Sequence, residues 1–152
     1  MLKSELLLGV VVAIGTGSVI AIQTALLSRS GASVGAVRSG LLTTITGALL
    51  ASIILVALWR QGSLSWQWNS ATWLALIVGG ILGTAALVGI SFASQRVGVT
   101  AALASILLGQ ILLSVIIDAR GLGSTAAIPF SLERALGLLL LGGGVYLLLF
   151  RQ

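Results

Sequence analysis

Two glutamines within long apolar stretches, Gln23 and Gln110, are the side chains of this chain best suited to contact a polar solute. An amide has two donors and an acceptor, and hydrocarbon leaves them unpaired. Such a side chain is kept there because it contacts a ligand or because it bonds a neighbouring helix, and the sequence supports the two roles equally. Hydroxyls are weaker candidates, because serine and threonine often bond their own backbone. The hydroxyl candidates are Thr16, Thr43 and Ser114.

Two of the three acidic residues are candidates for carrying a proton. Asp118 ends an apolar stretch, where a helix macrodipole disfavours a negative charge. It is equally well explained as a functional acid or as half of an interfacial ion pair with the nearby Arg120. Glu5 lies where a helix N-terminus favours an acid, which makes a structural role the better explanation. The remaining acid, Glu133, stands beside Arg134 in a first helical turn, and we assign it no function.

The residue types that the chain lacks, and the spacing of its charges, argue against several classes of function. The chain has no histidine and no cysteine, so it lacks the usual general base, the commonest metal ligand and any thiolate. We therefore predict no enzyme, no metal site and no cofactor. The net charge of +5 comes from eight basic residues that are scattered singly, and this pattern argues against a nucleic-acid partner.

Five apolar segments must position these side chains, and each is close to the roughly 20 residues that an α-helix needs to cross a bilayer core. The composition is 58% hydrophobic and 7% charged, whereas soluble domains carry about 25% charged residues. We predict an all-α integral membrane protein, one domain over residues 1–152, spanning the plasma or inner membrane several times. The expected transmembrane helices are 5–27, 34–58, 70–95, 98–117 and 132–150.

Small residues recur at every fourth position in the first four segments, including Gly17, Gly40, Gly79 and Gly109. Close approach over small side chains supplies the attraction between helices in lipid, so this pattern predicts four tightly packed helices. Hydroxyls and amides align on other faces, and they should turn inward to line a mildly polar cavity. The aligned sets are Glu5, Thr16 and Gln23; Ser39, Thr43 and Thr46; Thr84, Ser91 and Gln95; and Gln110, Ser114 and Asp118.

Polar stretches mark the expected turns between these helices. The serine-rich stretch 28–33 predicts a turn after the first helix, with Ser33 as the N-cap of the second. The stretch 95–98 predicts a tight turn, so the third and fourth helices should form an antiparallel hairpin. All four tryptophans lie in or beside the polar loop 60–70, which we expect to lie along the membrane surface. Ser131 is the expected cap of the last helix.

Basic residues divide equally between the two membrane faces that five spans define. Orientation normally follows an excess of Lys and Arg in cytoplasmic loops, and an equal division gives no preference. We therefore expect insertion in both orientations (dual topology) and an antiparallel homodimer, or a pair with a related five-helix chain. One face receives Lys3, Arg60, Arg120 and Arg134, and the other receives Arg29, Arg38, Arg96 and Arg151.

Several different short motifs follow one another along the chain in a specific order. They are Gln23 with Arg29, Thr46-Gly47, Gly79-Gly80-Ile81-Leu82-Gly83, Ser94 to Ala102, Gly109-Gln110 and Ile117-Asp118. In this order the chain resembles the five-helix YdcZ-type branch of the drug/metabolite transporter (DMT) superfamily over nearly its whole length. The resemblance implies a small-molecule transporter, or half of one, because larger members are similar to two five-helix halves in opposite orientations.

The combined expectation is a transporter that works by alternating access around a site at the interface of an inverted dimer. A nearly uncharged cavity favours a neutral or amphipathic solute. Two alternatives stay open: a lipid flippase, and a non-transporting scaffold or assembly partner for another membrane protein. The expected partners are membrane lipids, a small solute, and a second copy or a related chain.

Overall fold

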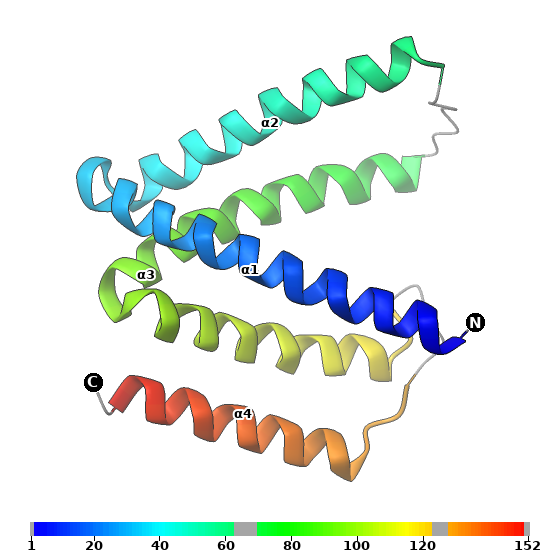
Figure 1. Cartoon of the computed structure of the whole chain (residues 1–152), viewed down its shortest axis with the longest axis vertical. Coiled ribbons are helices and arrows are strands. Elements are labelled where there is room, and N and C mark those ends of the chain that lie inside the picture. Colours follow the sequence, from blue (N-terminus) through cyan, green and yellow to red (C-terminus); the bar gives the residue numbers. More distant parts are fainter. Residues whose placement is uncertain (1, 63–69, 123–127, 151–152) are drawn as a thin grey trace. The chain divides into compact units, whose positions relative to one another are not determined.

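The computed structural model describes residues 2–62, 70–122 and 128–150, and it describes the side chains of the first helix from Leu7 onward. All regular structure in these ranges is helical. The helices are α1 (Leu2–Val34), α2 (Ala36–Arg60), α3 (Ser70–Ala119) and α4 (Leu132–Phe150), as shown in Figure 1. All four are long and apolar enough to cross a membrane. The predicted class, an all-α membrane protein, is therefore confirmed at this level.

Gly98 interrupts α3, the longest helix. An uninterrupted helix of the 50 residues of α3 would extend over about 75 Å at 1.5 Å per residue, whereas a bilayer core is only about 30 Å thick. Gly98 has φ 77° and ψ 164°, a combination that is essentially restricted to glycine. The interruption lies within the stretch 95–98, where the sequence predicts a turn. Four helices with one interruption leave the count of five membrane crossings a prediction.

The chain divides near this interruption into two compact units, residues 1–95 and residues 96–152. The first unit contains α1, α2 and the first part of α3. The second unit contains the remainder of α3 and α4. The antiparallel hairpin expected from the 95–98 turn concerns the placement of one unit against the other, and it stays a prediction.

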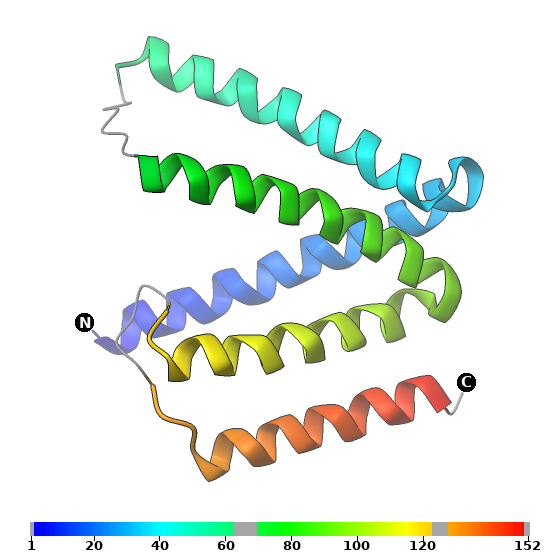
Figure 2. The same ribbon diagram turned by 180° about the vertical axis from the view of Figure 1, so that it is seen from behind.

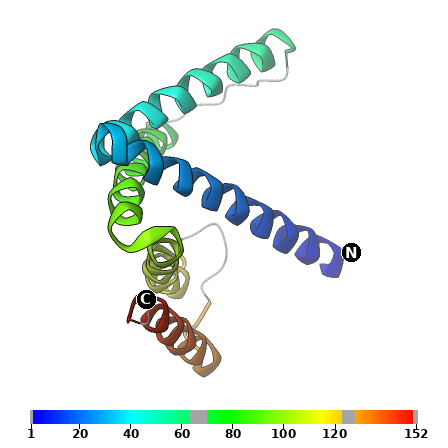
Figure 3. The ribbon, with the colours of Figure 1, turned by 60° about the vertical axis from the view of Figure 1, so that its left-hand side comes forward.

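In the first unit, α1 and α2 are joined at Gly35 and diverge from that end, as Figures 1 and 3 show from two directions. Gly35 has φ 91°, so the sharp change of direction uses glycine's conformational freedom. The helix continues through residues 28–34, and the turn expected there is wrong. Ser30 and Ser33 donate hydrogen bonds to the carbonyls of Leu27 and Arg29 (3.3 and 3.5 Å), which keeps both hydroxyls satisfied within the helix. Gly35 also takes the cap position predicted for Ser33, without a side-chain cap.

Close packing in the first unit is concentrated near its Gly35 end. A Cβ added at Gly40 would lie 2.7 Å from the Cα of Val88, so α2 touches the first part of α3 through backbone. A Cβ added at Gly31 would overlap the side chains of Ser91 and Gln95. A Cβ would instead meet no atom within 4 Å at Gly17, Gly47, Gly79 and Gly83. Within this unit, the small-residue pattern therefore marks tight contacts at one end only, which corrects the expectation that the first three predicted helices pack tightly over their small residues.

In the second unit, the last part of α3 and α4 run side by side (Figures 1 and 2). The backbone N–H groups of Gly121 and Ile128 both donate to the carbonyl of Asp118 (3.1 and 3.0 Å), which folds the connection back against the end of α3. Ser131 Oγ accepts from the backbone N–H of Arg134 at 3.4 Å, in the capping role that the sequence predicts. This connection therefore brings the end of α3 to the start of α4.

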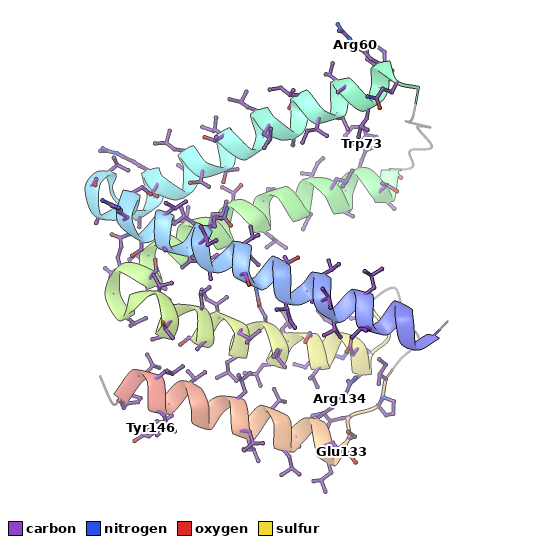
Figure 4. The ribbon with its side chains drawn as sticks, in the orientation of Figure 1. Arg60, Trp73, Glu133, Arg134 and Tyr146 are labelled. Atoms are coloured by element: carbon purple, nitrogen blue, oxygen red, sulfur yellow. The ribbon has the colours of Figure 1, made fainter. Side chains whose placement is uncertain are left out.

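Aromatic and basic side chains mark the other end of the first unit. Arg60 ends α2 and Trp73 lies in the first turn of α3, and Figure 4 shows the two at the same end of this helix pair. Both side chain types favour the membrane–water interface. The surface loop predicted between them includes residues 63–69, which lie outside the described residues. Apolar side chains along α2 face outward, with none of its most hydrophobic window buried, as a lipid-facing helix requires.

Candidate functional site

Three hydroxyls from three helix segments of the first unit converge on one backbone carbonyl. The carbonyl of Leu27 accepts from Ser30 on α1 at 3.3 Å, from Ser39 on α2 at 3.4 Å and from Ser91 on α3 at 3.1 Å. Ser30 Oγ and Ser39 Oγ are also 2.6 Å apart, so one of these two hydroxyls donates its single proton to the other, and the carbonyl receives at most two of the three hydroxyl protons at a time. Leu27, Ser39 and Ser91 are buried. Sharing one acceptor explains the long distances to the carbonyl, because a carbonyl has only two lone pairs.

Above this hydroxyl cluster, the divergence of α1 and α2 leaves a groove with a polar floor. Two pockets of about 410 and 460 Å³ lie there, and Gln23, Ser30 and Thr43 line both of them. Gln23 and Thr43 are half-buried. We call these two adjoining pockets, which share Gln23, Ser30 and Thr43, the Gln23 groove. The structure therefore brings together Gln23 and Thr43, which the sequence singles out on separate helices.

The polar stripe predicted on the second helix lines the larger pocket of this groove. Ser39, Thr43 and Thr46 all contribute to its wall. Thr46 Oγ1 donates to the carbonyl of Leu42 at 2.9 Å, so its proton is used within the helix. Within the described residues, the Gln23 amide makes no hydrogen bond, so its two donors and its acceptor are available to a ligand.

Ser30 is a lining residue that the sequence analysis misses. Leu26, Leu27 and Ser30 follow Gln23 by three, four and seven positions, so the four residues share one helical face. This spacing identifies Ser30 only if the helix is known to continue past residue 28. Arg29 also lines the smaller pocket and supplies its one positive charge among the lining residues.

The other α1 candidates lie apart from this groove. Thr16 is exposed, does not line either pocket, and donates its hydroxyl proton to the carbonyl of Val12 at 2.9 Å. This bond within its own helix matches the structural explanation for threonine in membrane helices. Glu5 lies on α1, but its side chain is outside the described side chains. A role for Glu5 in proton coupling stays a prediction.

In the second unit, two of the three residues of the predicted α3 stripe line a pocket of about 480 Å³ between α3 and α4. These are Ser114, which donates to the carbonyl of Ile111 at 3.0 Å, and Asp118. Gln110 is exposed and is not among the residues lining this pocket. Gln110 and Gln23 belong to different units, and their meeting in one cavity stays a prediction.

Asp118 pairs with Arg134, rather than with the Arg120 that lies near it in sequence. Arg134 Nη1 is 3.7 Å from Asp118 Oδ2, and both side chains are partly exposed. The folded-back connection between α3 and α4 explains this choice, because it places the first turn of α4 beside the last turn of α3. Figure 4 shows Arg134 at the start of α4, next to this end of α3. An ion pair is one of the two roles that the sequence allows for Asp118. A role for Asp118 in proton coupling stays a prediction.

The described residues hold no group of three or more metal-binding side chains. The pockets described above present hydroxyls, an amide, the Arg29 guanidinium and the Asp118–Arg134 ion pair. Such groups bind and release a solute through hydrogen bonds, and the Gln23 groove presents them on a largely apolar wall. This arrangement is typical of a binding site for small molecules that are neutral or mainly apolar.

Comparison with protein families gives one match. The family model DMT_YdcZ, described as "Putative inner membrane exporter, YdcZ", matches residues 8–147. The matched residues include nearly all of the four helices and both pockets of the Gln23 groove. Comparison with curated proteins and comparison with solved structures give no match.

Proposed function

Because the chain belongs to the YdcZ family of inner membrane exporters, we propose that it exports a small neutral or amphipathic molecule by alternating access within an antiparallel homodimer. Membership places it in the inner membrane as a multi-pass transport protein, in agreement with its apolar helices. The chemistry of the solute, the mechanism and the dimer are the parts that we propose.

The Gln23 groove is the observation that carries this proposal. It combines an amide that makes no hydrogen bond to the described part of the chain, a half-buried hydroxyl on Thr43 and apolar walls that include Leu26 and Leu42. An amide in an apolar wall selects ligands by hydrogen bonding without requiring a charge. Arg29 is the only charged residue among the described residues that line it, so a multiply charged solute would lose more hydration than the groove returns.

A second, inverted copy fits two features of the chain. The basic residues divide equally between the two faces, so neither orientation is preferred. Glycines at Gly17, Gly79 and Gly83 leave open space beside them in this chain, and small residues of this kind let a second set of helices approach closely. In the proposed dimer, Gln110 and Ser114 supply further solute contacts, and each copy offers one Gln23 groove to the shared pathway.

Solute counterflow in proteoliposomes tests the site without knowledge of a coupling ion. The panel begins with Nile red, a neutral dye, and ethidium, an amphipathic cation. Gln23→Leu should reduce counterflow about tenfold or more, because a bound solute loses hydrogen bonds worth at least about 1.4 kcal/mol. The matched control on the same helix is Thr16→Val, which removes a hydroxyl already bonded to Val12 and should change the rate less than about twofold.

Three results would contradict the proposal. Equal rates in the two variants would reject Gln23 as a solute contact. Translocation of labelled lipid without solute counterflow would indicate a flippase. If neither flux exceeds that of empty liposomes, a scaffold or assembly role becomes the better explanation.

The inverted dimer has a separate test. Two lysines added to the 60–70 loop should bias that loop toward the cytoplasm. Transport should then fall for the biased protein alone and recover when a copy biased in the opposite sense is co-expressed. Full activity of the biased copy by itself would argue against the antiparallel arrangement.

A further inference from the structure

The pocket of the second unit is built from one face of each of its two helices. Ile111, Ser114, Val115 and Asp118 line it from α3, with spacings of three, four and seven residues. Arg134, Gly137, Leu138 and Leu141 line it from α4 with the same spacings. Residues so spaced share a helical face, so the two lining sets oppose each other along two turns of antiparallel helix. We call this the Arg134 pocket.

Charge is confined to one end of the Arg134 pocket. Asp118 and Arg134 lie where the connection joins the two helices. Seven residues further into each helix, about 10 Å away, the lining residues are Ile111 and Leu141. This distance fits within one half of a bilayer core of about 30 Å. The pocket therefore runs from a charged end at the helix termini to an apolar end within the span.

The ion pair leaves hydrogen-bonding capacity unused. Arg134 Nη1 is buried and makes no hydrogen bond within the described residues, and its distance of 3.7 Å from Asp118 Oδ2 is too long for one. A guanidinium has five N–H donors, and an ionised carboxylate accepts through two oxygens. A buried donor without a partner is costly. A ligand that reaches both side chains would satisfy each of them.

We propose that the Arg134 pocket binds a membrane phospholipid that carries both a phosphate and a primary ammonium, as an ethanolamine phospholipid does. The phosphate accepts hydrogen bonds from Arg134, and the ammonium donates to Asp118. One acyl chain lies along Val115, Leu138 and Leu141. This site lies within the second unit, and it depends neither on the Gln23 groove nor on the export of a solute.

Charge complementarity favours this occupant over other lipids. A purely anionic headgroup would pair with Arg134 but would lie against the negative charge of Asp118. A quaternary ammonium has no N–H to donate to Asp118, although it carries the same charge. A soluble zwitterion would match the charges and leave the apolar part of the pocket empty, whereas a chain buried there adds to binding with each methylene. The ethanolamine phospholipid satisfies all three requirements.

Native mass spectrometry of the purified full-length protein tests the proposal with lipids added singly. The wild type should retain phosphatidylethanolamine about tenfold better than phosphatidylcholine or phosphatidylglycerol. Arg134→Gln should lose most of this retention, about tenfold, because a charge-assisted hydrogen bond to phosphate is removed. Asp118→Asn should remove the preference and favour phosphatidylglycerol. Arg60→Gln, at the end of α2, is the matched control and should behave as the wild type.

A steric variant tests the apolar part of the pocket without changing any charge. A Cβ at Gly137 would meet no atom within 4 Å, so Gly137→Leu fits the fold and fills space in the pocket. It should reduce retention of phosphatidylethanolamine about tenfold. Gly143→Leu, on the same helix with equally open surroundings, is the matched control and should leave retention unchanged.

Two outcomes would overturn the proposal. Unchanged retention in Arg134→Gln and Gly137→Leu would show that the lipid binds elsewhere or only as part of the annulus. Competition by glycerophosphoethanolamine, which has the same headgroup without chains, at concentrations equal to those of the lipid would show that the site takes a soluble zwitterion.

Discussion

In the first unit, three hydroxyls from three helix segments bond one carbonyl, whereas in the second unit a guanidinium faces a carboxylate at 3.7 Å without a hydrogen bond. The hydroxyl cluster is satisfied within the chain and holds helices together. The ion pair retains unused donors and acceptors and lies in a pocket. The difference separates two uses of polar groups in an apolar protein, structural in the first case and ligand-binding in the second.

The Gln23 groove stands between these two cases. It is built on the satisfied hydroxyl cluster, and among the described residues its amide, like Arg134 Nη1, makes no hydrogen bond. It carries little charge, whereas the Arg134 pocket carries one charge of each sign. We therefore expect the first unit to bind a solute of low charge and the second to bind a charged headgroup.

The largest effect should come from breaking the scaffold of the first unit. Gly40→Ala places a Cβ 2.7 Å from Val88 Cα, and backbone must move to relieve the overlap. We expect a loss of about 1–3 kcal/mol, in the range for overpacked sites, measured by thermal unfolding in detergent. Gly47→Ala is the control, because a Cβ there meets open space. Equal unfolding temperatures for the two variants would disprove the close approach of α2 and α3.

Gln110→Leu asks whether the second unit also contributes to the solute pathway. We expect counterflow to fall about tenfold, as for Gln23→Leu, while expression and unfolding temperature stay unchanged. Gln110→Asn keeps the amide and should retain more activity. If Gln110→Leu instead prevents folding, this glutamine bonds a neighbouring helix, and the contrast between the two units becomes sharper.

The smallest effect should come from thinning the hydroxyl cluster. Ser91→Ala removes the hydroxyl that bonds the Leu27 carbonyl from α3 and should destabilise the protein by about 0.6 kcal/mol, the average for such bonds between membrane helices. Thr84→Val removes a hydroxyl that bonds the carbonyl of Gly80 in its own helix and should cost less. Chemical unfolding of both variants makes the comparison. A larger loss for Thr84→Val would mean that the convergence on Leu27 does not hold the helices.

Hydropathy was sufficient to predict the class of protein, because apolar segments of this length have few alternatives to a helix in a membrane. The same periodicity predicted that Thr43 and its neighbours face inward, and the structure places Thr43 beside Gln23. The structural role of the serines in the stretch 28–33 is harder to predict from the sequence. The stretch 28–33 has the composition of a turn, but the hydroxyls of Ser30 and Ser33 bond carbonyls of the same helix, and the turn is made by Gly35.

Contacts between residues that are far apart in the sequence are also not predictable from the sequence alone. Asp118 has Arg120 two positions away and Arg134 sixteen positions away, and only the path of the connection decides between them. The unused capacity of Arg134 depends on distances of a few tenths of an ångström. Nothing in the residue types alone distinguishes a saturated ion pair from one that still accepts a ligand.

The backbone of Gly98 has a practical consequence. Since the chain leaves helical geometry there, the gene is open to division near this codon into polypeptides of residues 1–95 and 96–152. The first fragment contains α1, α2 and the first part of α3, and the second contains the remainder of α3 and α4. Cutting the chain at this point sacrifices no helix–helix contact made inside either fragment. Co-expression should therefore restore export, and each fragment becomes available to labelling, exchange or replacement independently of the other.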